Sequence, residues 1–185
     1  MAETEAMTNE NLIAIWSKAV DTQMHFNEMS VKSRQLGLTF VTAALALAVV
    51  LISQGDAFAF KFTVRAHEFT LHVSILILLA AILGLIAVRT LDLEVYHRML
   101  RGAVTFGEDF EQNNMLDILK LTKGMTQAIS HYSRYSDAKV TQVDGKYDYR
   151  GYNQKNAEKK IRSFYCSTII FLVLSAVLLL IFTNI

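Results

Sequence analysis

The 185-residue sequence contains no proline and only one cysteine, Cys166. An average usage of about 5% would supply roughly nine prolines. Because proline breaks helix interiors, its absence predicts long, uninterrupted helices, and a lone cysteine excludes a secreted disulfide scaffold. Only 19% of the residues are charged and the formal net charge is +1, whereas soluble domains usually carry about 25% charged residues. This composition argues against an ordinary soluble enzyme and against a basic nucleic-acid-binding protein.

Charged residues are also absent from three long apolar runs, at 36–52, 69–88 and 163–185. A helix needs about 20 predominantly apolar residues to cross a bilayer, and each run is close to that length. Buried core helices of this kind would need a large soluble shell, which the chain lacks. We therefore predict an all-α membrane protein with transmembrane helices at 36–54, 69–89 and 163–185.

The distribution of lysine and arginine predicts how these spans are oriented. The stretch 89–162 contains thirteen of these residues, the segment before the first span contains three, and the loop 55–68 contains two. Positive residues concentrate on the cytoplasmic side. The N-terminus and the region 90–162 are therefore expected in the cytoplasm, and the loop and the C-terminus outside. The acidic start of the chain is not typical of a signal peptide.

The N-terminal segment 1–35 is predicted to be a cytoplasmic amphipathic helix. Its apolar stripe contains three polar side chains, Gln23, Asn27 and Arg34. A buried polar group without a partner costs roughly 1–3 kcal/mol, so we expect Gln23 and Asn27 to form hydrogen bonds to another helix. For Arg34, such a partner and snorkelling toward lipid headgroups are equally consistent with the sequence.

The region 90–162 is predicted to be mainly helical, with one helix to about residue 112 and a second at 115–136. Gly102 in the first helix costs roughly 1 kcal/mol relative to alanine, which favours close packing or a bend. One face of this helix carries the apolar residues Val95, Met99, Phe106 and Phe110. The opposite face carries the polar residues Glu94, His97, Arg98, Arg101 and Glu108.

Two loops carry strand patterns. In the external loop, phenylalanines alternate with other residues across 58–66, which is a strand period. An aromatic belt at the membrane surface also explains them and is the interpretation we favour; a strand would need a partner, for example in another subunit. In the segment 137–152, Asp144 and Gly145 form a hairpin signal. Because isolated hairpins are marginal in water, a loop across 140–149 is equally consistent.

No arrangement of residues points to catalysis. The pairs His25 with Glu28 and Glu94 with His97 have the spacing used in dinuclear metal sites. His25 and Glu28, however, share a stripe with lysines, which favours a solvated face, so we expect no metal, no cofactor and no enzyme. Uncharged spans also argue against a carrier. Small residues that allow helices to approach closely favour self-association; they are Ala44, Ala48, Ala80 and Gly84.

Two segments together resemble a known group of proteins. The stretch AVDTQMHFNEMSVKSRQLGLTF (19–40) and the stretch YHRMLRGAVTFGEDFE (96–111) are similar to small membrane proteins of bacterial antiphage defence systems of the retron, cyclic-nucleotide and cyclic-pyrimidine types. The resemblance implies a homo-oligomer in the inner membrane that permeabilises or depolarises the bilayer upon infection. It also implies as partners the lipid bilayer, further copies of the chain and a cytoplasmic sensor protein, with no direct contact to nucleic acid. The positions it marks as family-specific are Gln23, His25, Asn27, Glu28 and Arg34, with Tyr96, His97, Arg98, Arg101, Gly102 and Glu108.

These positions lead to the hypothesis of a polar lock between the two cytoplasmic extensions. Asn27 and Arg34 would lie on one helix, while Glu94 and Glu108 would accept hydrogen bonds from arginine. Such a lock would hold the resting state closed, and Arg101→Ala is then expected to change toxicity more than expression. Two alternatives remain open: a non-catalytic membrane scaffold or regulatory subunit that recruits a cytoplasmic partner, and a small oligomeric channel.

Overall fold

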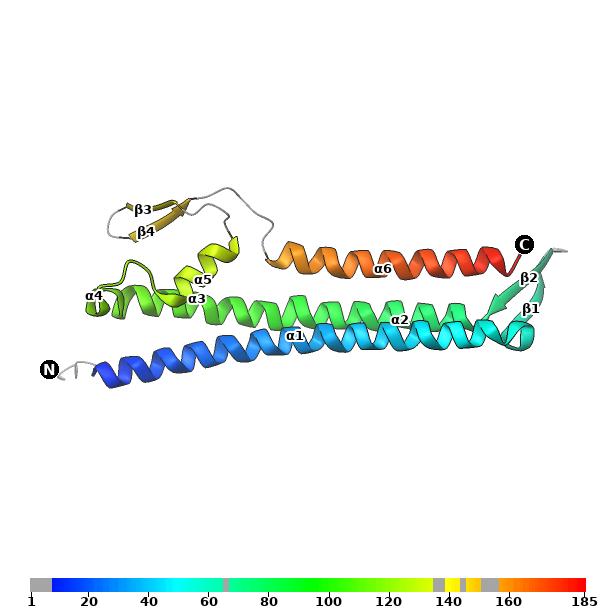
Figure 1. The fold of residues 1–185 in the computed structure, drawn as a ribbon, viewed down its shortest axis with the longest axis horizontal. Coiled ribbons are helices and arrows are strands. Elements are labelled where there is room, and N and C mark those ends of the chain that lie inside the picture. The colour runs from blue at the N-terminus through cyan, green and yellow to red at the C-terminus, as the bar shows by residue number, and fades with distance from the viewer. Residues whose placement is uncertain (1–7, 65–66, 135–138, 144–145, 151–156) are drawn as a thin grey trace. The chain divides into compact units, whose positions relative to one another are not determined.

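The computed structural model describes residues 8–64, 67–134, 139–143, 146–150 and 157–185. Most of these residues are helical (Figure 1). Three helices are long and apolar enough to cross a membrane, namely Asn9–Ser53, Val73–Asn114 and Ala157–Phe182. The chain divides into two compact units: unit 1 consists of Met1–Ser30 and Glu94–Lys160, and unit 2 consists of Val31–Leu93 and Ile161–Ile185.

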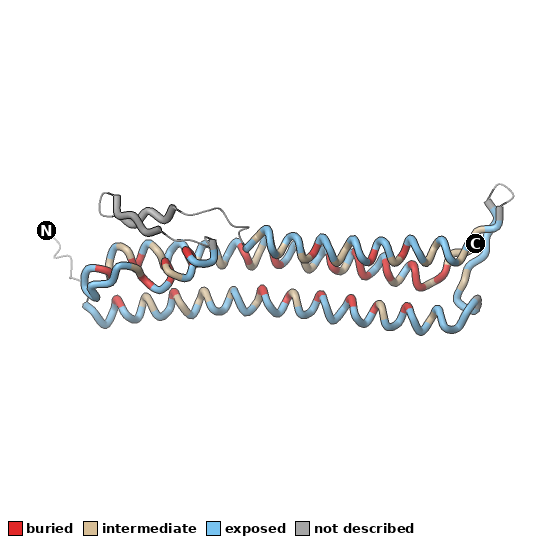
Figure 2. The backbone as a smooth tube through the Cα atoms, turned by 45° about the horizontal axis from the view of Figure 1, so that its top comes forward, coloured by how far each residue is buried: buried red, intermediate tan, exposed pale blue. Residues whose placement is uncertain are grey.

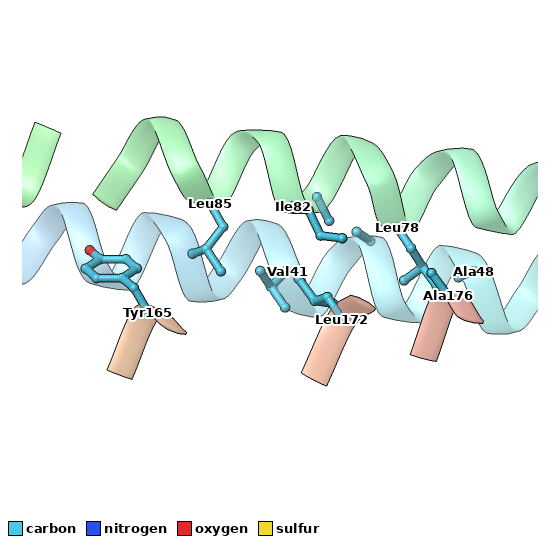
Figure 3. Packing of buried hydrophobic residues seen from close by; sticks show 10 residues of the cluster. Val41, Ala48, Leu78, Ile82, Leu85, Tyr165, Leu172 and Ala176 are labelled. Atoms are coloured by element: carbon cyan, nitrogen blue, oxygen red, sulfur yellow. The ribbon is translucent and has the colours of Figure 1, made fainter. Parts of the chain in front are cut away.

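Unit 2 is a three-helix assembly. It is built from the second half of α1 (Asn9–Ser53), from α2 (Val73–Thr90) and from most of α6 (Ala157–Phe182). The buried side chains are alanine and valine on α1, whereas α2 and α6 add larger ones beside an alanine each (Figure 3). Small residues let helices approach closely, which is how membrane helices gain packing energy. The buried cluster contains Val41, Ala44, Ala48, Leu78, Ala81, Ile82, Leu85, Tyr165, Leu172 and Ala176.

A β-hairpin connects α1 to α2. After the short helix η1 (Gly55–Phe58), strand β1 (Ala59–Val64) pairs with β2 (His67–His72) in antiparallel register. Phe62 lies opposite Phe69, with ring centroids 5.0 Å apart. The strand pattern of this loop is therefore real and its partner lies in the same chain, contrary to the aromatic belt we favoured. Because residues 67–72 pair with β1, the second apolar helix begins at Val73 rather than at residue 69 as predicted.

The start of α2 is fixed by side chains of unit 2. His72 is the N-cap residue, and its Nδ1 atom accepts a hydrogen bond of 3.2 Å from the Ser74 amide, as polar N-cap residues do. The Ser74 hydroxyl donates to the Ala48 carbonyl of α1 at 3.0 Å. Both side chains are buried. These contacts tie α2 to α1 next to the hairpin.

Unit 1 contains the first part of α1, then α3 (His97–Asn114), α4 (Leu116–Leu119), α5 (Met125–Arg134) and a hairpin of β3 (Lys139–Val143) and β4 (Lys146–Arg150). The hairpin alternative for 137–152 is thus confirmed (Figure 1), although the connecting residues 144–145 lie outside the described residues.

The single helix predicted at 115–136 is wrong, because α4 ends after one turn. Lys120 adopts a left-handed conformation with φ of 51°. The amide of Leu121 then donates to the carbonyl of Leu116 at 3.0 Å, which is the helix-ending pattern of a Schellman motif. Residues 121–124 are non-helical, and α5 begins at Met125.

A π-helix, η2 (Leu91–Tyr96), joins α2 to α3. It inserts a wider turn between these two helices. Met99 and Phe106, predicted on the apolar face, are exposed. Figure 2 marks where buried positions fall along each helix; in α3 they are His97, Gly107, Phe110 and Glu111.

Candidate functional site

Unit 2 contains a buried ion pair between its helices. The Asp92 side chain is fully buried, and the Arg34 side chain is 30% exposed. Arg34 Nε donates to Asp92 Oδ2 at 2.7 Å, and its Nη2 donates to Oδ1 at 3.4 Å. The hydroxyl of Tyr165 donates to the same Oδ2 atom at 3.0 Å. One carboxylate therefore links residues from α1, η2 and α6.

The chemistry of this cluster follows from where each residue lies. A buried carboxylate is costly unless it is paired and hydrogen-bonded, and here both oxygens accept bonds from a guanidinium. Arg34 is bound to a specific partner, which was one of the two alternatives for it. That partner is Asp92, a residue that the sequence-based hypothesis did not include; neither Glu94 nor Glu108 is the acceptor that it predicted for Arg34.

Gln23, which was also predicted to form an interhelical hydrogen bond, lies between helices of unit 1. Its Nε2 atom donates to the Ala103 carbonyl at 3.3 Å and to Thr126 Oγ1 at 3.5 Å. Asn27, by contrast, is exposed on α1. The expected interhelical contact is thus present at Gln23, and Asn27 lies on the solvent-facing side of the helix.

The polar face of α3 is mainly exposed. Arg98 forms an ion pair with Glu94 four residues earlier, and both side chains are exposed. Arg101 lies 3.9 Å from Glu158 and is 68% exposed. Exposed pairs contribute about 0–1 kcal/mol, so these contacts are weak candidates for a lock. His97 is buried, and within the described residues Glu108 forms no ion pair.

Some of the residues predicted to pack helices closely are buried between helices, and others are exposed. Ala44 and Ala48 lie in the buried cluster of unit 2, whereas Ala80 is exposed and its neighbour Ala81 is fully buried. A Cβ atom at Gly84 would lie 2.5 Å from the Phe40 ring, so this glycine permits a close approach. At Gly102 the position of a Cβ atom has no described atom within 4 Å, and the close packing predicted there is absent.

Glu111 is a second buried carboxylate, and it lies in unit 1. It caps α5, whose N-cap position is Gly124 and offers no side chain. The amides of Thr126 and Gln127 donate to its oxygens at 2.9 and 3.2 Å. The Thr126 hydroxyl donates at 2.8 Å, and the indole of Trp16 on α1 donates at 2.9 Å. Glu111 therefore joins α1, α3 and α5, and the sequence interpretation missed it.

Near the other end of α5, His131 is buried and its Nδ1 atom lies 3.0 Å from Lys123 Nζ. Burial lowers the pKa of His131 below 6.5, and the positive charge of Lys123 lowers it further. Burial also lowers the pKa of Lys123. A neutral imidazole can accept a hydrogen bond from the ammonium through Nδ1.

Comparison of the chain with family models, curated proteins and solved structures found no match. Among the described residues, no group of three or more His, Cys, Asp or Glu side chains is arranged to hold a metal ion. The buried groups of the two units are therefore the features on which a function can be argued.

Proposed function

We propose that this chain is a bacterial inner-membrane effector of antiphage defence that self-associates and permeabilises or depolarises the membrane when it is activated. The observation that carries the proposal is the ion pair of Arg34 with Asp92, to which Tyr165 also binds. This cluster, here called the unit 2 lock, links one residue from each apolar segment of the unit. In the proposed resting state it keeps the three segments closed.

Separation of these segments would break the pairing of two charged side chains. Charged groups in a membrane are expensive and are stable only when paired or hydrated. If Arg34 and Asp92 separate, each needs water or a new partner. Opening of the unit 2 lock would thus draw water toward the spans, which is what a permeabilising state requires.

Self-association has surfaces available in unit 2. Large apolar side chains of the spans remain exposed in the single chain, including Val49 at 66%, Leu83 at 68% and Phe182 at 77%. Either lipid or a second copy would cover them. The exposed small residue Ala80 lies on α2 in the same unit, and small residues are where membrane helices approach most closely.

The test is membrane potential and growth after controlled expression in a bacterial host. Arg34→Met and Asp92→Asn each open the unit 2 lock and are expected to depolarise cells without any infection, at equal protein level in the membrane. Arg98→Met, which removes an exposed ion pair, is the matched control and is expected to behave as wild type. The Arg101→Ala variant separates the earlier hypothesis from this one, because it disturbs only an exposed contact.

A normal potential with both lock variants, in protein that reaches the membrane, would contradict the proposal. The second candidate is a non-catalytic scaffold or regulatory subunit that recruits a cytoplasmic partner. It predicts normal potential and growth in every variant, together with crosslinks to that partner. A small channel of normal physiology would instead conduct in wild-type cells without toxicity.

A further inference from the structure

Unit 1 contains a cavity of about 470 Å³. This volume lies in the range of small-molecule sites, about 300–1,000 Å³. One wall comes from the start of α1, and the others come from the end of α3, from α4 and from the segment leading into α5. The lining includes Leu12, Trp16, Glu111, Met115, Leu119 and Met125.

The cavity combines apolar walls with a buried negative charge. Its lining is mostly aliphatic, aromatic or thioether; the polar residues are Asn9, Asn114 and Glu111, and only Glu111 is ionisable. Among the described residues, no lysine or arginine lines the cavity, and Glu111 forms no ion pair. Trp16, whose indole N–H donates to Glu111, lies in the same wall. A carboxylate and an indole therefore occur side by side next to an empty apolar volume.

The hydrogen bonds of Glu111 restrict which ligands suit the cavity. Its two oxygens already accept from the Trp16 indole, from the amide and hydroxyl of Thr126, and from the amide of Gln127. These donors satisfy its lone pairs, and the N-terminus of α5 stabilises its charge only in part, since no described lysine or arginine is paired with it. A ligand that needs a hydrogen-bond acceptor finds none left on Glu111. A cation without N–H groups needs only the charge and an aromatic face, and tryptophan is the best aromatic residue for that contact.

We propose that this cavity binds an organic cation of the aromatic quaternary ammonium class. The positive centre lies near Trp16 and Glu111, and the aromatic part fills the space between the leucine and methionine side chains. Methionine adapts to ligands of irregular shape, which suits such a site. This inference goes beyond the proposed function and does not depend on it, because it concerns binding and not membrane permeability.

The test uses Trp16, which is the only tryptophan of the chain, as a built-in probe. The purified full-length protein in neutral detergent is titrated with benzyltrimethylammonium, with its uncharged carbon isostere neopentylbenzene, and with benzenesulfonate. Free aqueous concentrations are matched for all three probes. We expect a saturable change in Trp16 fluorescence with the cation, affinity about tenfold weaker for the neutral isostere, and no saturation with the anion.

Variants at Leu119 test the role of charge without disturbing the cap of α5. Leu119 lines the cavity and is 53% exposed, so a longer polar side chain there can reach solvent. Leu119→Lys places a positive charge at the site and is expected to weaken binding of the cation about tenfold or more. Leu119→Gln is the uncharged control that loses the same leucine contacts, and Leu119→Lys should bind the cation about tenfold less tightly than Leu119→Gln does.

Three results would overturn the proposal. They are equal affinity for the cation and its neutral isostere, equal binding of the cation by Leu119→Lys and Leu119→Gln, and the lack of saturable binding of the cation in both fluorescence and equilibrium dialysis. The last result would point to a protein side chain as the occupant. None of these results bears on the membrane-potential test, so the two proposals fail separately.

Discussion

The two ends of the Arg34–Asp92 pair are expected to respond differently to mutation. Asp92 is fully buried, whereas Arg34 is 30% exposed. Arg34→Met leaves a buried carboxylate that has lost its guanidinium, while the Tyr165 hydroxyl still donates to it. Asp92→Asn leaves a cation that can extend toward water or headgroups, as long basic side chains do. Arg34→Met is therefore the more damaging change.

The magnitudes can be worked out from this asymmetry. Removing one partner of a buried ion pair costs about 3–5 kcal/mol when the other charge stays buried, and this applies to Arg34→Met. For Asp92→Asn we expect about 1.5–3 kcal/mol, the worth of hydrogen bonds to a charged group. The double variant Arg34→Met with Asp92→Asn leaves no buried charge. It should recover about 1–2 kcal/mol relative to Arg34→Met alone.

The assay is unfolding of the purified full chain in mixed micelles, followed by the loss of helical circular dichroism. Arg98→Met, at an exposed pair, should change the free energy of unfolding by about 1 kcal/mol at most. If Arg34→Met is no less stable than Asp92→Asn, or if the double variant is no better than Arg34→Met, then Asp92 is not a buried charge that depends on Arg34. The lock would then have no energetic basis.

Three further predictions concern local contacts. Gly102→Ala is expected to stabilise α3 by about 1 kcal/mol. Gly107→Ala should melt at a lower temperature than Gly102→Ala, because its Cβ would lie 2.5 Å from Gln23 Nε2 and such overlap costs about 1–3 kcal/mol. Thermal melts of the two variants test this. Unit 1 should lose stability as the pH falls below 6.5, because folding lowers the pKa of His131 from that value and the unfolded chain therefore binds more protons. In His131→Gln, the melting temperature followed by Trp16 fluorescence should depend less on pH. Asn184→Ala should speed amide exchange at Thr70, whose N–H donates to Asn184 Oδ1 at 2.8 Å, and unchanged exchange would show that this contact does not form in solution.

The apolar helices were predictable because their signal is a property of composition. Long runs without charge, in a chain without proline, leave few alternatives to helices that cross a membrane. The hairpin at 59–72 was harder, because the first strand shows its period but Phe69 to Leu71 are also typical of a membrane helix. Pairing with β1 decides their conformation, and strand pairing is a contact between segments that composition does not report.

Glu111 shows why a buried carboxylate can escape a reading of the sequence. Its role follows from Gly124, which starts a helix without a capping side chain, so that a residue thirteen positions earlier supplies the acceptor. A glycine at an N-cap is a weak signal, since glycine is common there. The connection between the two residues appears only when α3 and α5 pack together, with Gly107 giving the space for Gln23 and Thr126.

Asp92 was missed for a different reason, and it carries the argument for function. In a regular helix it lies seven residues after the buried Leu85, on the same face, so its burial was accessible from the sequence. A lone aspartate just beyond an apolar run, however, is ordinarily a solvated residue at the membrane surface. Glu94 and Glu108, which a regular period aligns, belong to unit 1, where Glu94 pairs with Arg98. A chain that packs a fully buried aspartate against an arginine and a tyrosine of two other apolar helices accepts a desolvation cost that leucine would avoid. That cost is best explained if the pair has to open, which is what the proposed activation requires.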